Sequence, residues 1–287
     1  MDAKDRFGTK EKPTWCPGCG DFAIWNGVKN ALTNLNIPRH RVMVVYGIGC
    51  AGNMNNFIKT YSIHAIHGRT LPVATGVRLA NHGLKVITVG GDGDAYGIGM
   101  SHFIHACRRN LDITSIVSDN QIYGLTTGQY SPTSEKGFVS KTSPEGSIDS
   151  PVNPMTIALS AGATFIARGF SGYHEHLEEL IKQGLEHKGF SFIDVFQPCV
   201  TFNKINTYDF FRARVYDLKE ENHNTESLEQ AFNKALEWGD RIPIGVFYKK
   251  AKPTYEDEVS TLKDSPLVKK QPHKGYVDVT ESLKEYM

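Results

Sequence analysis

The sequence predicts an α/β fold, a doubly wound and mostly parallel sheet with a C-terminal extension. Short apolar runs at 42–46, 85–89 and 113–117 have the pattern of strands that are buried on both faces. Segments with helical spacing alternate with the predicted strands, which favours parallel strands joined by crossover helices. The runs also end in turns rich in Gly, Asp or Asn, at the place where an open parallel sheet carries its ligand-binding loops.

Local patterns predict the individual elements. Pro and Gly make residues 1–20 irregular, and a helix is expected from about Asp21 until Pro38 ends it. The stretch 123–154 is rich in Gly, Ser, Thr and Pro, and a loop of that length inside a compact domain is usually functional. The remaining predicted elements are a helix at 97–109, a helix at 155–161, a strand at 164–167, a helix at 173–187 and a strand at 190–196.

Composition limits the class of protein. The chain has 287 residues, 40% apolar and 22% charged, with 32 Lys and Arg against 31 Asp and Glu, which gives a net charge of +1. These values exclude a disordered chain and a disulfide miniprotein, and they provide no basic surplus for nucleic-acid binding. We expect residues 1–206 to form the α/β domain. Residues 207–287, with an amphipathic stretch at 228–238, are expected to pack on the core or on a partner subunit.

The N-terminal sequence is charged and has no apolar segment, so no signal peptide is expected. No run of about 18 apolar residues occurs, so we expect neither a membrane helix nor a membrane partner, and we expect a cytoplasmic protein. In a reducing compartment cysteines are more often metal ligands, catalytic groups or core residues than disulfides. The cysteines are Cys16, Cys19, Cys50, Cys107 and Cys199.

Four chemically distinctive side chains each come just after a predicted strand. They are Cys50, Asp92, Asn120 and Cys199. In an open parallel sheet the carboxyl ends of the strands share one edge, and ligands bind in the crevice there. Residues that are far apart in the sequence are therefore expected to form a single site.

The turn Gly90-Gly91-Asp92-Gly93-Asp94 indicates a phosphate site that includes a metal ion. Glycines let the backbone approach a phosphate closely, and a following helix N-terminus adds donors. A bare carboxylate would repel a diphosphate unless a divalent cation lay between them. Magnesium prefers oxygen ligands in near-octahedral geometry. The expected protein ligands are the Asp92 carboxylate, the Asn120 amide oxygen and a backbone carbonyl near Ile122.

Two other interpretations of this turn remain. A dinucleotide-binding fingerprint has the spacing G-x-G-x-x-G, but Gly91, Gly93 and Gly97 are spaced one residue too widely. A tight turn with a capping Asp is the ordinary role of an isolated G-D-G sequence. The place of Asn120 after the next strand weakens this second interpretation.

Cys16 and Cys19 form a C-x-x-C motif, which suits zinc, an iron–sulfur cluster or a redox dithiol. A thioredoxin-type dithiol should follow a strand, and none is predicted before Cys16. With Cys50 and Cys199 the chain offers four thiolates, enough for zinc or for a 4Fe–4S cluster. The expected position beside a diphosphate site favours a redox centre. Cys107, in the middle of a predicted helix, is interpreted as a small buried side chain.

Several motifs together resemble one family. Gly91-Asp92-Gly93, followed 27 residues later by Asn120, is similar to the thiamine-diphosphate and magnesium motif of thiamine enzymes. The stretches 66–69, 90–99, 119–129 and 197–203 resemble the β subunit of 2-oxoacid:ferredoxin oxidoreductases, and the likeness extends over roughly residues 12–250. This resemblance implies the thiamine-diphosphate-binding fold, with a domain of the diphosphate type. It also implies a 4Fe–4S cluster on Cys16, Cys19, Cys50 and Cys199.

The resemblance implies an activity as well. This activity is the CoA-dependent oxidative decarboxylation of a 2-oxo acid, with 2-oxoglutarate favoured over pyruvate, and electrons pass through the cluster to ferredoxin. Thiamine is the catalyst, so no catalytic side chain is assigned in this chain. An α subunit, or a fused γα subunit, is expected to carry the pyrimidine-binding domain and its activating Glu. The alternatives are a zinc-stabilised nucleotide-binding regulatory subunit and a non-redox thiamine-dependent carboligase.

The resemblance further implies roles for single residues. The implied contacts with thiamine diphosphate are Ile48, Gly49, Cys50, Ala51, His67, Gly91, Gly93, Asp94, Gly124 and Leu125. Asn53, Leu125 and Thr127 are implied to affect the choice of substrate. The family often has Lys at the positions of Asn53 and Thr127. A 2-oxo acid with a second carboxylate would therefore need its cation elsewhere, for example from Arg69 or from the other subunit.

Overall fold

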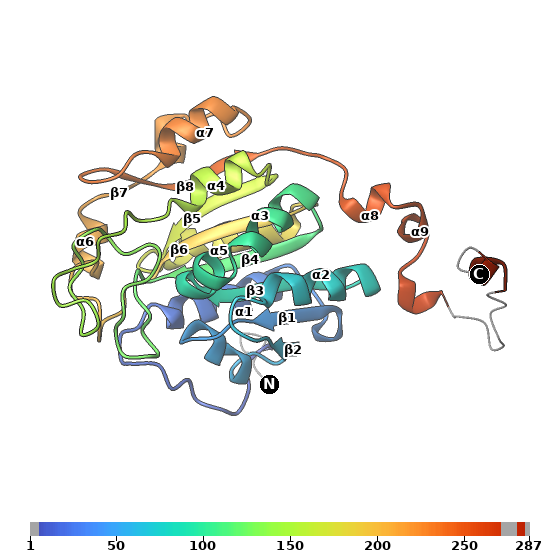
Figure 1. The fold of residues 1–287 in the computed structure, drawn as a ribbon, viewed down its shortest axis with the longest axis horizontal. Helices are drawn as coiled ribbons and strands as arrows, with labels where there is room; N and C mark the ends of the chain where they lie inside the picture. Colours follow the sequence, from blue (N-terminus) through green and yellow to red (C-terminus); the bar gives the residue numbers. More distant parts are fainter. Residues whose placement is uncertain (1–5, 271–279, 285–287) are drawn as a thin grey trace.

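The structure is a computed structural model, and it describes residues 6–270 and 280–284. In these ranges the chain forms an eight-stranded sheet with the order β2-β1-β3-β4-β6-β5-β8-β7 (Figure 1). All neighbouring strands are parallel except β5 and β8, which are antiparallel. The strands are β1 (Val42–Tyr46), β2 (Tyr61–His64), β3 (Lys85–Gly91), β4 (Ile113–Asp119), β5 (Phe165–Phe170), β6 (Ser191–Phe196), β7 (Val215–Asp217) and β8 (Ile242–Lys249). The predicted fold class is confirmed.

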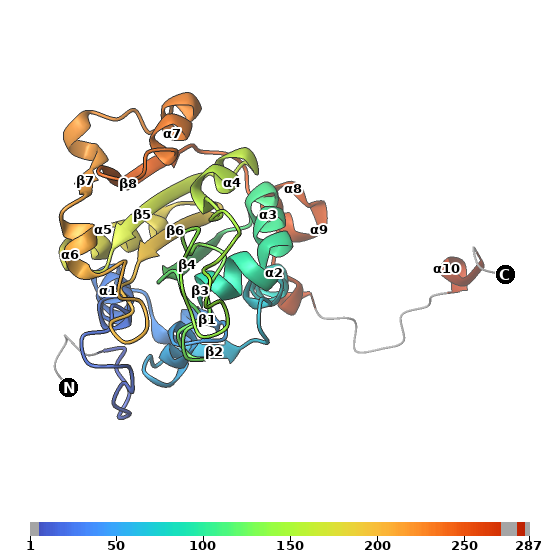
Figure 2. The same ribbon diagram turned by 60° about the vertical axis from the view of Figure 1, so that its left-hand side comes forward.

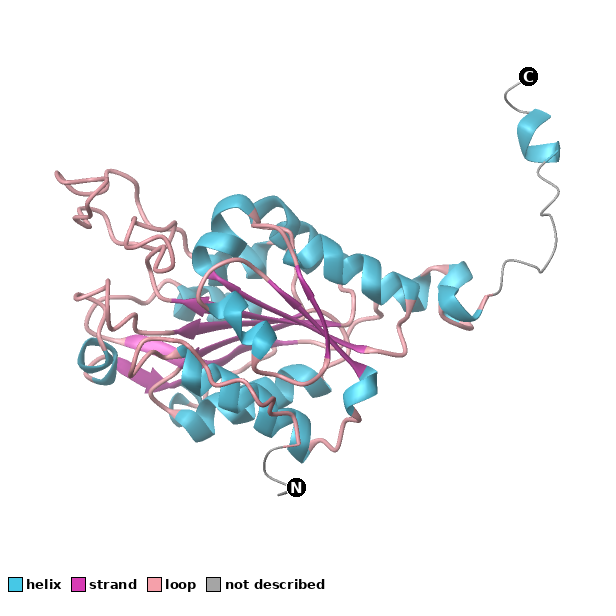
Figure 3. Ribbon diagram, turned by 90° about the horizontal axis from the view of Figure 1, so that it is seen from below, coloured by secondary structure: helices cyan, strands magenta, loops and turns pink. Residues whose placement is uncertain are grey.

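Helices cover both faces of the twisted sheet (Figure 3). One face is covered by α1 (Asp21–Asn34) and α5 (His174–Glu186), and the other by α2 (Thr70–Ala80), α3 (Met100–Arg109) and α4 (Pro154–Ser160). The other helices are α6 (Tyr208–Arg212), α7 (Leu228–Ala235), α8 (Tyr255–Glu258), α9 (Ser260–Lys263) and α10 (Thr280–Lys284). Short 3₁₀ turns occupy Arg39–Arg41, Ala51–Asn56, Leu218–Glu221 and Leu267–Lys269, and a π-helical segment occupies Gly93–Ile98.

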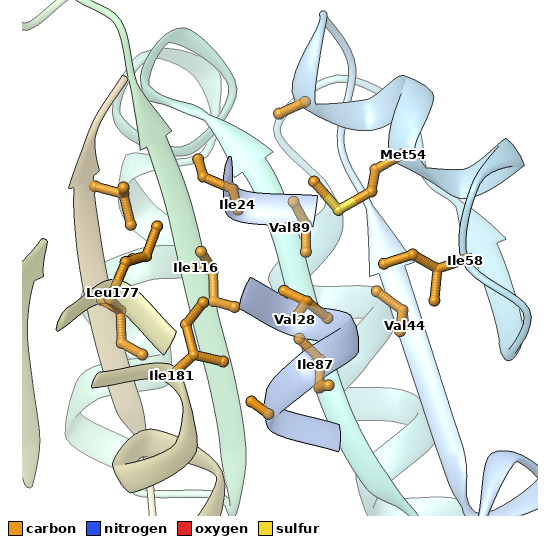
Figure 4. Packing of buried hydrophobic residues seen from close by; sticks show 14 of the residues in the cluster. Ile24, Val28, Val44, Met54, Ile58, Ile87, Val89, Ile116, Leu177 and Ile181 are labelled. Atoms are coloured by element: carbon orange, nitrogen blue, oxygen red, sulfur yellow. The ribbon is translucent and has the colours of Figure 1, made fainter. Parts of the chain in front are cut away.

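The layer under α1 and α5 shows how the apolar pattern fixes the sheet. Ile24 and Val28 of α1 and Leu177 and Ile181 of α5 are buried in one cluster (Figure 4). The strand side chains in this cluster include Val44, Ile87, Val89 and Ile116. Burial of each such side chain is favourable by about 1.5–3 kcal/mol relative to exposure. This layer therefore holds together β1, β3 and β4, the central strands that lead into the predicted site.

Most predicted elements are confirmed to within a few residues at their ends, but the predicted helix at 97–109 is divided. Its first part belongs to the π-helical segment Gly93–Ile98, and α3 begins only at Met100. Gly99 lies at the junction, where a Cβ atom would come within 2.6 Å of the backbone oxygen of Asp94. The close approach of the two backbone segments at Gly99 thus accompanies the change from π-helix to α-helix.

Within residues 1–206, the strand β2 and the helix α2 were not predicted because their patterns are weak. β2 is a four-residue edge strand with every side chain exposed, so it has no apolar run. α2 contains Pro72 and Gly76, two residues that usually argue against a helix. Pro72 lies in the first turn, where its missing N–H removes no intrahelical hydrogen bond.

Residues beyond 206 belong partly to the sheet. β8 pairs with β5 and β7 pairs with β8, so two strands from this region extend the sheet itself. The strand β8 is buried over most of its length, and Phe247 packs with the core on the α2–α4 face. Helix α7 lies inside the predicted amphipathic stretch and buries Ala231 and Ala235. The domain boundary at residue 206 stays a prediction.

A buried ion cluster ties the C-terminal helix α8 to α2. The Arg78 guanidinium of α2 pairs through Nε with Glu256 of α8 and through Nη2 with Asp112 at 3.1 Å, and its Nη1 donates to the Leu84 oxygen at 2.7 Å. Arg78 is 6% exposed and Glu256 is 5% exposed. Since both charges are out of water, the pair is stable only while both partners are present.

Arg78→Met is expected to destabilise the fold by about 3–5 kcal/mol, because it leaves the Glu256 carboxylate buried without its cation. The free energy of unfolding from urea denaturation measures this effect. A matched control is Lys188→Met. Lys188 pairs at 2.8 Å with Asp257 of α8, and the Lys188 and Asp257 side chains are 66% and 40% exposed. That change is expected to cost less than about 1 kcal/mol. Equal losses in the two variants would contradict the role given to Arg78.

No helix in the ranges 6–270 and 280–284 combines the length and the apolar character needed to cross a bilayer. The cytoplasmic location stays a prediction.

The carboxyl ends of β1, β3, β4 and β6 meet at one edge, because these strands are parallel neighbours. The pairing of β4 with β6 continues one residue further, where the Gln197 N–H donates to the Asp119 oxygen at 2.9 Å. The long segment between β4 and α4, drawn in green in Figure 2, leaves from this edge. The loops that follow these strands carry the side chains selected from the sequence.

Candidate functional site

Asp92 stands directly after β3 and is 1% exposed. Its Oδ2 accepts hydrogen bonds from Ser131 Oγ at 2.5 Å and from Thr133 Oγ1 at 2.6 Å, and both hydroxyls come from the long segment after β4. Burial raises the pKa of Asp92 to about 6, although the hydroxyl groups act in the opposite direction. The long segment therefore has a structural task, since it fixes the orientation of this carboxylate.

Gly93 makes room for the ring of Tyr123. A Cβ atom at residue 93 would lie 2.2 Å from Tyr123 Cε1, and the Tyr123 hydroxyl donates to the Gly93 oxygen at 3.1 Å. The ring thus lies across the turn after β3 and holds it against the loop after β4. This contact gives a steric reason for glycine in the G-D-G turn.

Asp94 connects three segments of the site through a single oxygen atom. Its Oδ1 accepts from the N–H of Ile48 at 3.1 Å and from the N–H of Gly68 at 2.8 Å, and it lies 2.9 Å from His67 Nδ1. The His67 side chain is 36% exposed, whereas the Asp94 side chain is fully buried. Because a carboxylate oxygen accepts the hydrogen bond from the Nδ1–H group, the other nitrogen of the imidazole ring is left for a further partner.

Asn120 stands directly after β4 with both ends of its amide engaged. Its Oδ1 accepts from the Ile122 N–H at 3.2 Å, and its Nδ2 donates to Gln197 Oε1 at 3.0 Å. A carbonyl oxygen has two lone pairs, so Oδ1 can accept this hydrogen bond and still bind a cation.

The side chains of these turns surround one cavity of about 270 Å³, here called the Asp92 pocket. All the residues expected to bind the cofactor or magnesium line it: Ile48, Gly49, Cys50, Ala51, His67, Gly91, Asp92, Gly93, Asp94, Asn120, Ile122, Gly124 and Leu125. Tyr123 and Thr126 complete the lining and were not selected from the sequence. The structure thus brings together residues from four separate loops.

The four expected cluster cysteines line a second cavity of about 200 Å³, here called the thiol pocket. The two pockets share Cys50, Asn120, Gly124 and Leu125 in their linings. Gly124 lies close to two of the thiols, because a Cβ atom there would lie 3.6 Å from Cys199 Sγ and 3.8 Å from Cys50 Sγ. The thiols of Cys16, Cys19, Cys50 and Cys199 therefore do gather beside the Asp92 pocket.

The surroundings of the thiols are mostly apolar and contain one buried carboxylate. Burial, and then the negative charge of Asp21, raises the pKa of Cys50 to about 12, and the same two causes raise the pKa of Cys19. Asp21 accepts from Cys19 Sγ at 3.6 Å and from Ser118 Oγ at 2.8 Å. A positive centre bound among the thiols would oppose both effects, since metals bind the deprotonated sulfur.

Trp15 fixes the C-x-x-C segment to the loop after β1. Its Nε1 donates to the Cys50 oxygen at 2.7 Å, and its ring contacts Phe22 and Phe57 edge to face, with centroids 5.2 and 5.1 Å away. The segment before α1 is therefore held in place without regular secondary structure.

In the ranges that the structure describes, no three His, Cys, Asp or Glu side chains come together as ligands for one metal ion.

The positions expected to affect substrate choice are separated. Leu125 lines both pockets, Asn53 lines only the thiol pocket, and Thr127 lines neither, although its backbone has a left-handed φ of 76°. Arg69 lines neither pocket. Cys107 is buried in α3, on the α2–α4 face of the sheet, and takes no part in the thiol pocket.

Sequence reasoning missed the residues that support the site. Ser131 and Thr133 hold Asp92, Asp21 contacts Cys19, and Gln197 contacts both Cys19 and Asn120. Gln197 could have been selected from the sequence, because it stands directly after β6, and residues that follow parallel strands lie at the ligand-binding edge of the sheet.

Comparison with family models places both halves of the chain. Residues 40–195 match the C-terminal TPP-binding domain of thiamine pyrophosphate enzymes. Residues 199–264 match the C-terminal part of the pyruvate ferredoxin oxidoreductase β subunit. The first match contains Asp92 and Asn120, and the second begins at Cys199.

Individual relatives agree with these matches. A 2-oxoacid:ferredoxin oxidoreductase subunit β from Sulfolobus sp is 45% identical over 258 residues, which cover 85% of each chain. A 2-oxoglutarate synthase subunit from Archaeoglobus fulgidus is 35% identical over 261 residues, 90% of this chain and 93% of the other.

A solved structure matches the whole chain. It is a 2-oxoglutarate:ferredoxin oxidoreductase from Magnetococcus marinus with 2-oxoglutarate, coenzyme A and succinyl-CoA bound. The TM-score is 0.90 at 39% identity, and the match covers 100% of this chain and 96% of that one. The chain therefore belongs to the family of 2-oxoacid:ferredoxin oxidoreductase β subunits, and it is one part of an oxidoreductase that requires partner subunits.

Proposed function

We propose that this subunit serves the CoA-dependent oxidative decarboxylation of a 2-oxo acid to acyl-CoA and CO2, with electrons passed through a 4Fe–4S cluster to ferredoxin. The single observation that carries the proposal is the lining that the Asp92 pocket and the thiol pocket have in common, which includes Cys50 and Gly124. A reaction that releases electrons needs an acceptor next to the reacting carbon. The two pockets provide such neighbouring places.

The Asp92 pocket fits thiamine diphosphate with Mg²⁺. The side-chain oxygens of Asp92 and Asn120, with the carbonyl of Ile122, would hold the ion, and hard oxygen ligands of this kind are those that Mg²⁺ prefers. Gly91 would leave the turn open for the diphosphate, since a Cβ atom there would meet only the Ser118 oxygen at 3.9 Å, and the backbone of Gly93 would line the same turn. When bound, thiamine diphosphate supplies the carbanion stabilisation that decarboxylation requires, while the protein supplies binding and orientation.

The other side chains of the Asp92 pocket would orient this cofactor. His67 is held by Asp94 through Nδ1 and turns the rest of its ring to the pocket. Ile48 and Leu125 are 37% and 52% exposed at the pocket, and they offer apolar surface to the ring system of the cofactor.

The thiol pocket fits a 4Fe–4S cluster better than a zinc ion. Zn–S bonds of about 2.3 Å require four sulfurs to converge on one point. Here the four thiols surround a cavity of about 200 Å³. Thiolates from Cys16, Cys19, Cys50 and Cys199 would hold the cluster, which supplies one-electron redox chemistry when bound.

We propose 2-oxoglutarate as the preferred substrate over pyruvate. The relative from Archaeoglobus fulgidus and the structure from Magnetococcus marinus both carry 2-oxoglutarate in their names. The second carboxylate of this acid needs a cation, yet Arg69 lines neither pocket and Asn53 and Thr127 are uncharged. We therefore place that cation on the partner subunit.

The partner would be an α subunit, or a fused γα subunit, that carries the pyrimidine-binding domain and its activating Glu. Apolar side chains near the Asp92 pocket would pack against it. Ile48, Ile66 and Leu125 are 37%, 78% and 52% exposed, and exposed apolar side chains that gather in one patch mark protein–protein contacts.

The test is to purify the co-expressed subunits without oxygen and to assay iron, sulfide, zinc and thiamine. The expected result is a brown complex with iron and sulfide that reduces ferredoxin with 2-oxoglutarate and CoA, and does so more slowly with pyruvate. A colourless zinc protein would support the nucleotide-binding regulatory subunit instead. Thiamine-dependent turnover that persists without the four cysteines would support the non-redox carboligase.

The isolated chain is expected to give no 2-oxo-acid-dependent dye reduction, because residues 6–270 form one α/β unit around a single sheet, whereas thiamine needs a second, related domain against its aminopyrimidine ring. The measurement compares the chain alone, the partner alone and the reconstituted complex at equal concentration. Full activity of the chain alone would contradict the need for a partner.

A further inference from the structure

We infer that Gln197 is a positioning residue that couples the thiol pocket to the magnesium ligand Asn120. This inference rests on the proposed function, because it assumes a cluster on the thiols and Mg²⁺ at Asp92. Gln197 stands directly after β6 and is fully buried. It lines the thiol pocket and contacts Asn120, a residue that lines both pockets.

The two ends of the Gln197 amide serve different partners. Nε2 donates to Cys19 Sγ at 3.1 Å and to the Pro198 oxygen at 3.1 Å. Oε1 accepts from Asn120 Nδ2 at 3.0 Å, and the Ser118 hydroxyl lies 3.3 Å away. Both N–H groups and the oxygen therefore have partners, and one planar group joins a cluster ligand to a metal ligand.

The orientation of this amide is determined by its neighbours. Rotation by half a turn would bring its NH₂ group against the NH₂ group of Asn120 and its oxygen against the Pro198 oxygen. Asn120 cannot turn to compensate, because its Oδ1 accepts from the Ile122 N–H at 3.2 Å. The hydrogen-bond pattern thus has one satisfactory arrangement.

Packing holds the Gln197 side chain in the same place. A Cβ atom on Gly20 would lie 2.8 Å from Gln197 Cγ and 2.6 Å from Ser171 Oγ. Glycine at residue 20, directly after Cys19, therefore leaves the space that the Gln197 stem occupies. The end of the C-x-x-C segment therefore packs directly against the loop after β6, where Gly20 faces the Gln197 side chain.

Two consequences follow for the groups that the pockets would hold. A hydrogen bond to a thiolate stabilises negative charge on the cluster, and reduction adds negative charge, so the Cys19 contact raises the reduction potential. The contact with Asn120 keeps Nδ2 turned toward Gln197, which leaves Oδ1 for the cation. Residues that orient a metal ligand in this way affect metal affinity by about 10–100-fold when they are replaced.

The test uses Gln197→Met, which keeps the length of the side chain and removes both hydrogen-bonding ends. In the co-expressed complex, titration calorimetry with thiamine diphosphate and Mg²⁺ is expected to show affinity about 10–100-fold weaker than in the wild type. A potentiometric titration followed by electron paramagnetic resonance is expected to show a more negative midpoint potential. Gln197→Leu serves as a second variant if the Met variant is poorly folded by thermal melting.

Gln183→Met is the matched control. Gln183 lies on α5, donates to Glu179 at 3.0 Å on the surface and touches neither pocket, so both values should equal those of the wild type. Wild-type values for both quantities in the Gln197 variants, or a change in only one of them, would overturn the coupling while leaving the proposed function intact. A wild-type complex that binds neither iron nor thiamine diphosphate would overturn the proposed function and the coupling together.

Discussion

Asp92→Asn is expected to abolish Mg²⁺-dependent binding of thiamine diphosphate and with it the turnover of 2-oxo acids. The variant keeps the size of the side chain but removes the negative charge that an ion between Asp92 and a diphosphate requires. It also places an NH₂ group where Oδ2 now accepts from Ser131 and Thr133, or forces the amide to turn its nitrogen toward the ion. Replacement of residues that only orient a ligand costs about 10–100-fold in affinity, so loss of the ligand charge should cost more than about 100-fold.

The measurement is calorimetric titration of the purified complex with thiamine diphosphate at fixed Mg²⁺ concentration, together with ferredoxin reduction. Asp209→Asn is the matched control, because the Asp209 side chain is 96% exposed and pairs with Arg212 on the surface helix α6. Its binding and turnover should equal those of the wild type. Affinity within about threefold of the wild type in Asp92→Asn would contradict the assignment of the metal site.

Cys199→Ala is expected to remove the cluster, because it deletes one of the four thiols that line the thiol pocket. The three thiols left cannot complete the Cys₄ ligation of a 4Fe–4S cluster. Iron and sulfide content should fall, the visible absorption band should disappear, and ferredoxin reduction should stop. Binding of thiamine diphosphate should persist, since Asp92 and Asn120 are unchanged.

Cys107→Ala provides the control for a cysteine replacement as such. Cys107 is fully buried in α3 among apolar side chains, and burial raises the pKa of its thiol. The change removes a small core group and should lower stability slightly while iron content and turnover stay at the level of the wild type. Equal loss of iron from the two variants would show that the colour depends on the stability of the fold and not on the ligands.

The sequence was sufficient to predict which residues would lie close together at the candidate site, because the topology of a parallel sheet determines where its strands end. Apolar runs marked β1, β3, β4 and β6, and parallel strands must end at the same edge. Cys50, Asp92, Asn120 and Cys199 therefore came together in the structure although they span 150 positions.

The same reasoning failed for β2 and β8. β2 is too short and exposed to show a pattern, and β8 lies in a region where the surrounding sequence is polar.

The supporting contacts could not be predicted, because they join residues with no fixed spacing. Ser131 and Thr133 reach Asp92 from 39 and 41 positions away, and Gln197 reaches Cys19 across 178 positions. A hydroxyl or an amide in a polar loop looks the same in the sequence whether it faces water or a carboxylate. Only the packing of the long segment against the turn after β3 decides between these outcomes.

Asp94 has a consequence for how such a subunit can diverge. One carboxylate oxygen holds Ile48, His67 and Gly68, so a change in any of these loops disturbs the others. The loops that contain Ile48, His67 and Gly68 are thus joined to one another at the Asp92 pocket through Asp94. Leu125 lines both pockets, is 52% exposed and is not one of the residues joined to that oxygen, so adaptation to new acids has more freedom there.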